Sequence, residues 1–421
     1  MVAVGAAGGS SNSSGALSVL YSFPGNFGGP GFGAIAWYQV SELVKAGHSV
    51  TLVAGSISRT VPGLRAVVRS LDVGGRRISE RTIGRSRVNA WHDLRTRRVL
   101  SGGSFDIVHV WPLAAARTLE LARRLGVTGI RESPNTHLAH AIALVSREYA
   151  RLGLAIPTVW SWFGVRDRLE LVEREYAAAS ALLVPSDAVA QSFLARGFEP
   201  HRLIRHQYGF DPATIRIPVR QGSRPFTAVF VGRGVPRKGL HYALDAWLAS
   251  RASASGRLLI YGEIDPDYSE LLSGALAHPS VFVCGPTEKP NTAYAKADVL
   301  LLPSVEEGSA LVTYEAQGAG VVPLVSSASG AVVDHGVNGL VHEPGDVAAL
   351  TAHIDIVFEQ EKAHRHLRAA ALSEAQHLTW AEAGRVLVGA YRSAMNRPTN
   401  DYYGRPSETV SSTWDSDSAV S

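Results

Sequence analysis

Short apolar runs alternate with helical patterns along most of the chain. In the first half, the clearest runs are each followed by a turn-forming residue and a helical stretch: Leu17–Tyr21, Ser49–Ala54, Ile107–Val110 and Ala181–Val184. A second series follows: Thr227–Val231, Arg257–Tyr261, Val281–Cys284, Val299–Leu302 and Val321–Val325, with helices predicted at Gly239–Ser250 and Leu311–Gly318. This alternation is typical of parallel sheets built from βαβ units, so the predicted fold class is α/β.

The chain length of 421 residues is too great for one core of ordinary size and predicts two α/β domains of roughly 200 residues each. A polar, proline-bearing stretch separates the two series of strands and is interpreted as the interdomain linker. The predicted order is a disordered tail (1–16), an N-terminal domain (17–215), the linker (216–225), a C-terminal domain (226–378), a closing helix (379–395) and a second disordered tail (396–421).

Two glutamates lie beyond a predicted strand of the second domain. The strand Asp298–Leu302 is followed by Pro303 and Ser304, by Glu307 in a turn expected to be exposed, and by a helix that holds Glu315. Ligands of open parallel sheets bind beyond the carboxyl ends of the strands. On one continuous helix the spacing of eight residues would offset the two carboxylates by roughly 80°, which would leave both on one side.

A basic loop follows the first strand of the second domain. Arg233 and Lys238 lie between the strand that ends at Val231 and the helix predicted from Gly239. Cations on a loop before a helix N-terminus suit a diphosphate leaving group, whose negative charge grows as its bond breaks. Such a site needs no metal ion.

A glycine-rich loop occupies the corresponding place in the first domain, from Gly25 to Gly33. Backbone amides at Gly28 and Gly29 could approach an anion closely, and a helix N-terminus follows. The loop matches G-x-G-x-x-G only loosely. No acidic residue follows the second strand where the ribose of a dinucleotide would need one, which argues against binding of NAD.

Three histidines of the first half follow strand-like runs, which would direct them toward the interdomain cleft: His109, His137 and His140. A histidine there could hydrogen-bond a reacting sugar, and the alternative for each is an ordinary buried polar residue.

The segment Glu307–Ala316, which follows Ala297-Asp298-Val299 and Pro303-Ser304, resembles the E-G-x-x-L-x-x-x-E-A hallmark of the retaining family 4 glycosyltransferases of GT-B fold. The Gly-Arg and Lys-Gly pairs around Arg233 and Lys238 are similar to the same family's donor loop. The turn Tyr208–Asp211 and the helix Leu378–Met395 also resemble family features. Ser309 and Ala310 stand where the family usually has a bulky residue and then a small one.

This resemblance implies two Rossmann-like domains facing each other across a cleft, with retaining transfer of a hexosyl group from a nucleotide-diphosphate sugar to a hydroxyl acceptor. It implies that the donor diphosphate is held by Arg233, Lys238, Gly28 and Gly29. The ribose and sugar would contact Glu315, Gly308, Ser309, Ala310 and Leu311, and the catalytic residues would be Glu307 and His137. A nucleotide-sugar epimerase of the same fold and a catalytically silent sugar-binding scaffold are the alternatives.

The charge is unevenly distributed, although the net charge is only +4. Between Arg59 and Arg98 there are eleven arginines and three acidic residues. Two interpretations stay open: a solvated basic face, or a surface for a lipid-linked or anionic acceptor and for peripheral contact with an anionic membrane. No aromatic interleaving or binding motif accompanies the arginines, so nucleic acid is not an expected partner.

The remaining composition predicts a cytoplasmic protein, with peripheral attachment to the inner face of the plasma membrane as an open alternative. Cys284 is the single cysteine, which excludes an intramolecular disulfide, and it is interpreted as a small core residue. The start of the chain has no basic or sustained apolar segment typical of a signal peptide. The D-x-D triplets at Asp265 and Asp415 are interpreted as a turn and part of the tail, so neither a metal nor a cofactor is expected.

Overall fold

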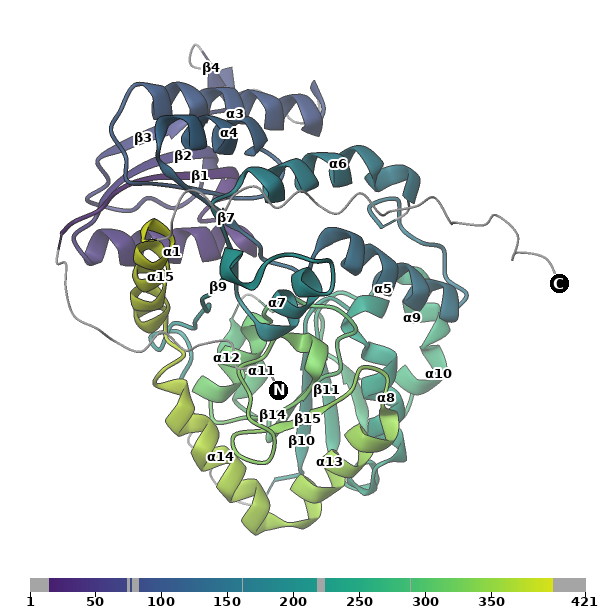
Figure 1. Cartoon of the computed structure of the whole chain (residues 1–421). Helices are drawn as coiled ribbons and strands as arrows, with labels where there is room; N and C mark the ends of the chain where they lie inside the picture. The colour runs from purple at the N-terminus through teal and green to yellow at the C-terminus, as the bar shows by residue number, and fades with distance from the viewer. Residues whose placement is uncertain are drawn as a thin grey trace.

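Two parallel sheets, each covered by helices, form the two domains seen in the upper and lower halves of Figure 1. The computed structural model describes residues 15–73, 76–77, 83–160, 162–217, 224–287 and 289–396. The predicted C-terminal tail and most of the predicted N-terminal tail and linker lie outside these ranges, as do Arg81 and the D-x-D triplet at Asp415.

The N-terminal sheet has seven parallel strands in the order β3-β2-β1-β6-β7-β8-β9. In that order they are Ala66–Arg69, Ser49–Ile57, Ser18–Phe27, Ile107–Val110, Thr128–Glu132, Ala181–Val184 and Leu203–Arg205. Its helices are α1 (Phe32–Lys45), α3 (Arg85–Ser101), α4 (Ala116–Leu125), α5 (Leu138–Arg151), α6 (Trp162–Ala178), α7 (Asp187–Leu194) and the 3-10 turn η1 (Pro200–Arg202). A short hairpin joins β4 (Asp72–Val73) to β5 (Arg76–Arg77).

The C-terminal sheet has six parallel strands in the order β12-β11-β10-β13-β14-β15. In that order they are Val281–Val283, Arg257–Tyr261, Thr227–Val231, Val299–Leu302, Val322–Ser326 and Leu340–His342. Its helices are α8 (Leu240–Ala249), α9 (Pro266–Leu271), α10 (Ser273–Leu276), α11 (Pro290–Tyr294), α12 (Leu311–Gly318), α13 (Val347–Glu359) and α14 (Glu361–Ala375). The 3-10 turns are η2 (Pro236–Lys238), η3 (Arg251–Ala254) and η4 (Ser327–Ser329).

Every strand that the apolar runs predict is present, within a few residues of its predicted ends except for the longer β1 and β2. The two predicted helices are α8 and α12. Strand β7 lacks an apolar run because it carries the buried charges of Arg131 and Glu132. The interpretation of Cys284 as a core residue is wrong: it is exposed just after β12, a short strand at the edge of the sheet.

A long final helix, α15 (Trp380–Met395), returns from the C-terminal domain and packs against α1. Figure 1 shows it in yellow beside the purple α1. Thr379 caps it by accepting a hydrogen bond from the amide of Glu382, at 3.3 Å. Leu387 and Tyr391 are buried in a core cluster that includes residues of both domains. Hydrophobic burial therefore joins the domains along this helix.

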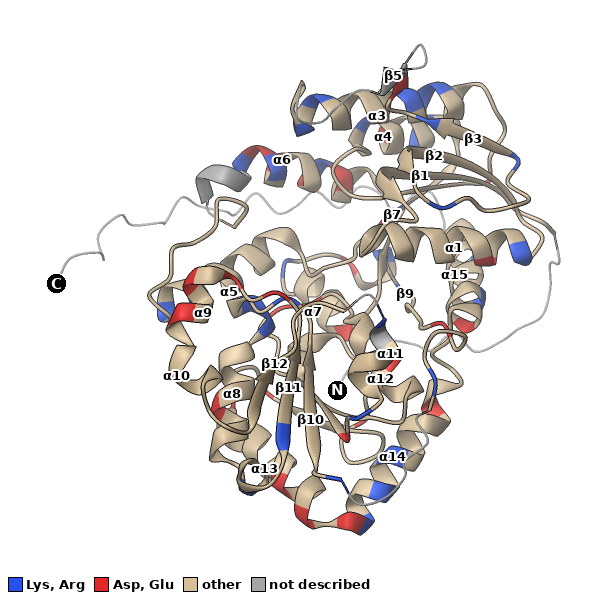
Figure 2. Cartoon of the chain, turned by 180° about the vertical axis from the view of Figure 1, so that it is seen from behind, with Lys and Arg blue, Asp and Glu red and all other residues tan. Residues whose placement is uncertain are grey.

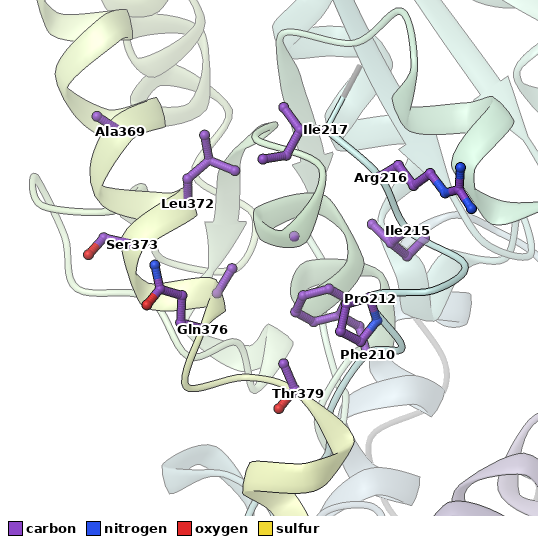
Figure 3. Close-up of a pocket in the computed structure, with 12 residues that line it drawn as sticks. Phe210, Pro212, Ile215, Arg216, Ile217, Ala369, Leu372, Ser373, Gln376 and Thr379 are labelled. Atoms are coloured by element: carbon purple, nitrogen blue, oxygen red, sulfur yellow. The ribbon is translucent and has the colours of Figure 1, made fainter. Parts of the chain in front are cut away.

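The chain crosses between the domains at two segments that lie side by side. The amide of Phe210 donates to the carbonyl of Leu378 at 3.0 Å, and the amide of Trp380 donates to the carbonyl of Phe210 at 3.2 Å. A Cβ on Gly209 would lie 2.6 Å from the Thr379 carbonyl carbon, so this close approach requires glycine. An apolar cavity of 900 Å³ lies between this crossing and α14 (Figure 3).

Candidate active site

Both sheets reverse their strand order at a central point: between β1 and β6 in the N-terminal sheet, and between β10 and β13 in the C-terminal sheet. The crevice beyond the carboxyl ends of such strands is where open α/β sheets bind ligands. In the C-terminal domain, the loops that meet there are 232–239 and 303–310. Gly239 has a φ of 70°, and a Cβ on it would lie 2.1 Å from the carbonyl oxygen of Pro303. Glycine therefore allows the two loops to touch.

Two carboxylates and two cations gather between these loops. Arg237 Nη1 lies 3.1 Å from Glu306 Oε2 and 3.5 Å from Glu307 Oε2. Lys238 Nζ forms an ion pair with Glu307 Oε1. Both glutamates are buried, so the expectation that this turn is exposed is wrong. The cations explain how the carboxylates tolerate burial, since buried charges require paired charges or hydrogen bonds.

The surroundings of Lys238 make its charge sensitive to a further anion. Burial, and after it the neighbouring charge of Arg237, lower the pKa of Lys238 to about 7, although Glu306 acts in the opposite direction. An additional negative charge beside this ammonium group would stabilise its protonated form. Sequence reasoning singled out Lys238 but gave no role to Arg237 and Glu306, although the doublets Arg237-Lys238 and Glu306-Glu307 were visible.

Glu315 lies on α12, which begins at Leu311, so Glu307 precedes the helix instead of sharing it. The predicted helix Leu311–Gly318 is confirmed, and the offset of roughly 80° calculated for one continuous helix does not apply to Glu307. Tyr294 of α11 donates a hydrogen bond to Glu315 Oε2 at 2.8 Å. Burial raises the pKa of Glu315 to about 7, while this hydrogen bond lowers it in part. Burial therefore favours the protonated form of this carboxyl group.

Arg233 lies on the same loop as Lys238 but has a different partner. Its Nη2 lies 2.5 Å from Asp265 Oδ1, and its side chain is 67% exposed. Arg233 lines a cavity of 530 Å³ together with Gly262, Asp265 and Gly285, which follow strands β11 and β12. Sequence reasoning did not identify this cavity, because its lining comes from three separate segments without a recognisable motif.

The loop of Glu306 and Glu307 touches the N-terminal domain directly. Thr136 Oγ1 donates to Glu306 Oε1 at 2.6 Å, and Ser186 Oγ donates to the carbonyl of Gly308 at 2.5 Å. A Cβ on Gly308 would lie 1.6 Å from the carbonyl oxygen of Pro134. The glycine is therefore required by the contact between the domains.

The residues after Gly308 stabilise the start of α12. Ser309 Oγ lies 2.7 Å from the hydroxyl of Tyr314 and donates to the carbonyl of Gly330 at 3.1 Å. The amide of Ala310 donates to the carbonyl of Ser329 at 3.3 Å, and Leu311 is the first helical residue. The side chain of Ser309 is thus held by the protein itself.

His137 does not point into the cleft as predicted. It is buried against the rings of Tyr176, Phe193 and Phe198 in the N-terminal core. Its Nε2 lies 3.2 Å from Glu173 Oε1. Burial lowers its pKa, and Glu173 opposes that shift. The prediction of a catalytic role is corrected to a structural one, at the N-terminus of α5.

The amides of Gly28 and Gly29 form hydrogen bonds within their own loop. The amide of Gly28 donates to the carbonyl of Gly33 at 2.9 Å, and that of Gly29 donates to the carbonyl of Asn26 at 3.1 Å. A Cβ on Gly28 would lie 2.4 Å from the Cβ of Arg59. The expectation that these amides hold a diphosphate is corrected, because backbone acceptors already occupy both of them.

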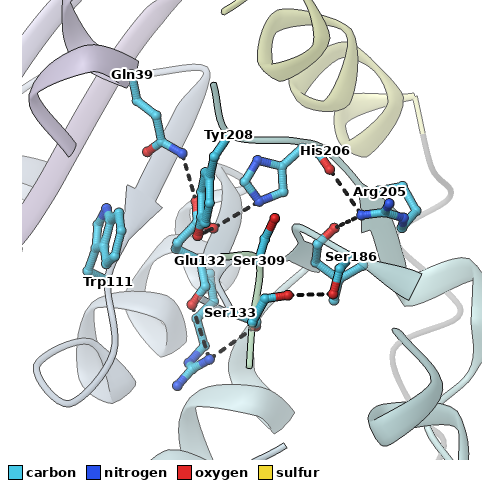
Figure 4. Close-up of polar contacts among 12 residues, drawn as sticks. Gln39, Trp111, Glu132, Ser133, Ser186, Arg205, His206, Tyr208 and Ser309 are labelled. Carbon is cyan, nitrogen blue, oxygen red and sulfur yellow. Dashed lines mark hydrogen bonds and ion pairs between the residues drawn. The ribbon is translucent and has the colours of Figure 1, made fainter. Parts of the chain in front are cut away.

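A buried polar network lies under the carboxyl end of β7 (Figure 4). Glu132 accepts hydrogen bonds from Tyr208 at 3.0 Å and from Gln39 at 3.1 Å. Its carboxylate also lies 2.9 Å from His206 Nε2 and 3.3 Å from His109 Nε2. Burial alone would raise the pKa of Glu132, but the two histidines hold it below its usual range. His109 therefore positions β7 instead of facing the cleft.

The arginines between Arg59 and Arg98 lie in different surroundings. The guanidinium carbon of Arg59 lies 3.4 Å from the centroid of the Trp37 ring, a cation–π contact. Figure 2 shows Lys and Arg in blue along α3 and also on α6. Within the ranges that the structure describes, no helix is both long and apolar enough to span a bilayer.

Comparison with known sequences shows which proteins this chain is similar to. Residues 225–360 match the family described as glycosyl transferases, group 1. An uncharacterized glycosyltransferase of Methanocaldococcus jannaschii is 31% identical over 176 residues, which are 40% of this chain and 45% of the relative. D-inositol 3-phosphate glycosyltransferase of Frankia alni is 26% identical over 401 residues, which are 84% of this chain and 92% of the relative.

Solved structures agree on the fold. Sucrose-phosphate synthase from Thermosynechococcus elongatus has a TM-score of 0.66 and 18% identity, over 89% of this chain and 98% of its own. The Anabaena protein HepE in complex with UDP-glucose has a TM-score of 0.61 and 15% identity, over 89% of this chain and 100% of its own. The C-terminal domain is thus similar to group 1 glycosyltransferases over residues 225–360, and the predicted GT-B fold is confirmed.

Proposed function

We propose that this protein transfers a hexosyl group from a nucleotide-diphosphate sugar to a hydroxyl acceptor, with retention of the anomeric configuration. The observation that carries the proposal is the buried pairing of Lys238 and Arg237 with Glu306 and Glu307 at the mouth of the C-terminal sheet. The group 1 family match and the UDP-glucose complex of the structural neighbour HepE support a donor of this class.

Each group has a role that follows from its charge. Lys238 supplies the cation for the donor diphosphate, and Arg233 lies on the same loop beside the cavity near β11 and β12, which suits the nucleoside. Glu307 accepts hydrogen bonds from hydroxyls of the sugar, and Glu315 from those of the ribose. Fixed charges in a site shielded from water stabilise a developing diphosphate charge without reorganising during the reaction.

The bond changes balance without a cofactor. The acceptor oxygen forms a bond to the anomeric carbon while the bond from that carbon to the diphosphate oxygen breaks. The acceptor proton passes to the departing diphosphate, so the products are a glycoside and a nucleoside diphosphate. Attack from the face that the leaving group vacates retains the configuration, and contact between the domains excludes competing water.

The test is incubation of the protein with labelled nucleotide sugars and a set of hydroxyl acceptors. Release of nucleoside diphosphate together with a glycosylated acceptor supports the proposal, and NMR of the new anomeric centre tests retention. Interconversion of the donor sugar would instead indicate an epimerase. Binding of the donor without turnover would indicate a sugar-binding scaffold.

Lys238→Ala tests the diphosphate role. We expect kcat/KM to fall by about 10²–10³-fold, because one charged group aimed at the leaving oxygens is removed. Glu307 keeps its contact with Arg237 at 3.5 Å, so its charge stays paired in the variant.

The matched control for that variant is Lys45→Ala, which removes a lysine whose side chain is 70% exposed. It should leave turnover unchanged. Near-normal activity of Lys238→Ala, with the donor still turned over, would remove the proposed role.

A further inference from the structure

Another cavity, of 480 Å³, lies at the point of the N-terminal sheet where the strand order reverses. Its walls come from the end of β1, the segments after β6 and β7, and helix α6. Most of the lining is apolar, and it includes the aromatic rings of Phe23, Phe32, Trp111, Trp160 and Tyr176. This size and apolar lining are typical of small-molecule sites.

Two arginines give the cavity a positive charge. Arg85 at the start of α3 and Arg168 of α6 both line it, and the described lining contains no carboxylate. Arg131, the third arginine of the lining, is neutralised by Glu175, whose Oε2 lies 3.0 Å from its Nε. The described lining therefore combines an apolar body with cationic side chains.

Arg168 is the cation with spare hydrogen-bonding capacity. Its Nη2 donates to the carbonyl of Val159 at 2.6 Å, while its buried Nε has no partner in the part of the chain that the structure describes. Burial lowers the pKa of Arg168, and the nearby charge of Arg85 lowers it further. An anion between the two arginines would favour the charged form of Arg168 and so oppose both shifts.

The cavity ends at the candidate transfer site. Pro134, Asn135 and Thr136 form one of its walls. The same segment contacts the loop of the two glutamates, through the hydrogen bond from Thr136 to Glu306 and the close packing of Gly308 on Pro134. A molecule that fills the cavity therefore lies next to the segment that contacts Glu306 and Gly308.

We propose that this cavity binds the acceptor, and that the acceptor is an apolar molecule with an anionic group held between Arg85 and Arg168. This inference rests on the proposed function and specifies its substrate class. Aromatic walls bury the body of the acceptor, and the arginines select its charge. Neutral sugars match neither feature of the lining.

The experiment measures binding of defined probes to the full chain by calorimetry and by tryptophan fluorescence, since Trp111 and Trp160 line the cavity. The anionic probes are 2-naphthoate and dodecyl phosphate, which distinguish an aromatic acid from an alkyl phosphate. Each is paired with its neutral alcohol, 2-naphthalenemethanol or dodecanol. At least one anion should bind at least about tenfold more tightly than its alcohol, as for a charge-assisted hydrogen bond.

Two variants locate the binding. Arg168→Gln removes one cation, and Val159→Asp places a negative charge on a cavity residue that is 51% exposed and so tolerates substitution. Each should weaken binding of the preferred anion by about tenfold or more. Arg87→Gln is the matched control, because it removes an exposed arginine of α3 that does not line the cavity.

Binding of UDP, measured on the same samples, separates this inference from the proposed function. UDP binding without binding of either anion overturns the acceptor class alone, as does equal binding of the anions and their alcohols. Unchanged anion affinity in Arg168→Gln and Val159→Asp also overturns it. Failure of the wild-type chain to bind UDP or to turn over any nucleotide sugar overturns the proposed function and the acceptor role with it.

Discussion

Individual charges in the C-terminal domain are paired across loops that are far apart in the sequence. Lys238 and Glu307 were identified from their motifs, but their direct ion pair depends on the contact between Gly239 and Pro303. Arg237 joins the two glutamates and had no separate motif. Glu315 differs from these residues, since its described polar contact is the hydroxyl of Tyr294 and burial dominates its ionisation.

Glu315 makes stability depend on pH in a defined window. Its pKa in the folded protein is raised to about 7 from an ordinary 4.5, so the unfolded chain loses this proton first as the pH rises. The free energy of unfolding should therefore fall between about pH 4.5 and 7 and then level off. Glu315→Gln stays neutral, so urea unfolding at pH 8 should show it more stable than wild type by about 2–3 kcal/mol.

The difference between Glu315→Gln and wild type should vanish near pH 4, where both side chains are neutral. Glu361→Gln is the control, because Glu361 has a 79% exposed side chain and should change stability by less than about 0.5 kcal/mol at every pH. If the free energies of unfolding of Glu315→Gln and wild type changed with pH in the same way, the raised pKa of Glu315 would be contradicted.

At the scale of elements, apolar runs predicted the central strands well because those strands are buried on both faces. The edge strand β3 and the polar strand β7 lack that signal. Helix α15 was predicted to return to the first domain, and the structure shows how it does so. Gly384 allows close packing, because a Cβ there would lie 2.4 Å from the Cβ of Glu42 on α1.

Two glycines of α15 should respond in opposite ways to substitution by alanine. Gly384→Ala forces α15 away from α1 and should lower the free energy of unfolding by about 1–3 kcal/mol. Gly389→Ala, where a Cβ meets no atom within 4 Å, should raise it by about 0.5–1 kcal/mol through reduced chain entropy. Urea unfolding of both variants tests the prediction, and equal effects would show that the α1 contact is unimportant.

In the whole molecule, the points at which the two sheets reverse their strand order face each other. The cluster of Lys238 and Glu307 comes from one domain and the aromatic cavity from the other, and the segment 134–136 joins them. The apolar crossing around Phe210 and α15 keeps the two domains associated. We expect the proposed transfer reaction to depend on the close contact at Gly308.

Gly308→Ala tests the importance of that contact, because the added Cβ would overlap the carbonyl of Pro134. We expect kcat/KM for glycosyl transfer to fall by about 10²-fold, since a displacement of roughly 1 Å is enough for such a loss. Binding of UDP should change little, because the loop that carries Arg233 and Lys238 remains intact. Turnover assays and calorimetry measure the two effects.

Gly274→Ala is the control for this variant, since a Cβ there meets no atom within 4 Å. It should retain both activity and UDP binding. Wild-type turnover by Gly308→Ala would show that the domains need not approach so closely.

The sequence by itself determined the βαβ alternation, the two domains and the loop motifs around Lys238, Glu307 and Glu315, because these signals are local: runs of apolar residues, glycines and charged residues at short spacing. Only the tertiary structure decided which groups meet. His137 and Glu132 became buried, Gly28 and Gly29 used their amides within their own loop, and the cavity with Arg168 formed from segments far apart in the chain. Burial and pairing depend on distant neighbours, and no local pattern encodes those neighbours.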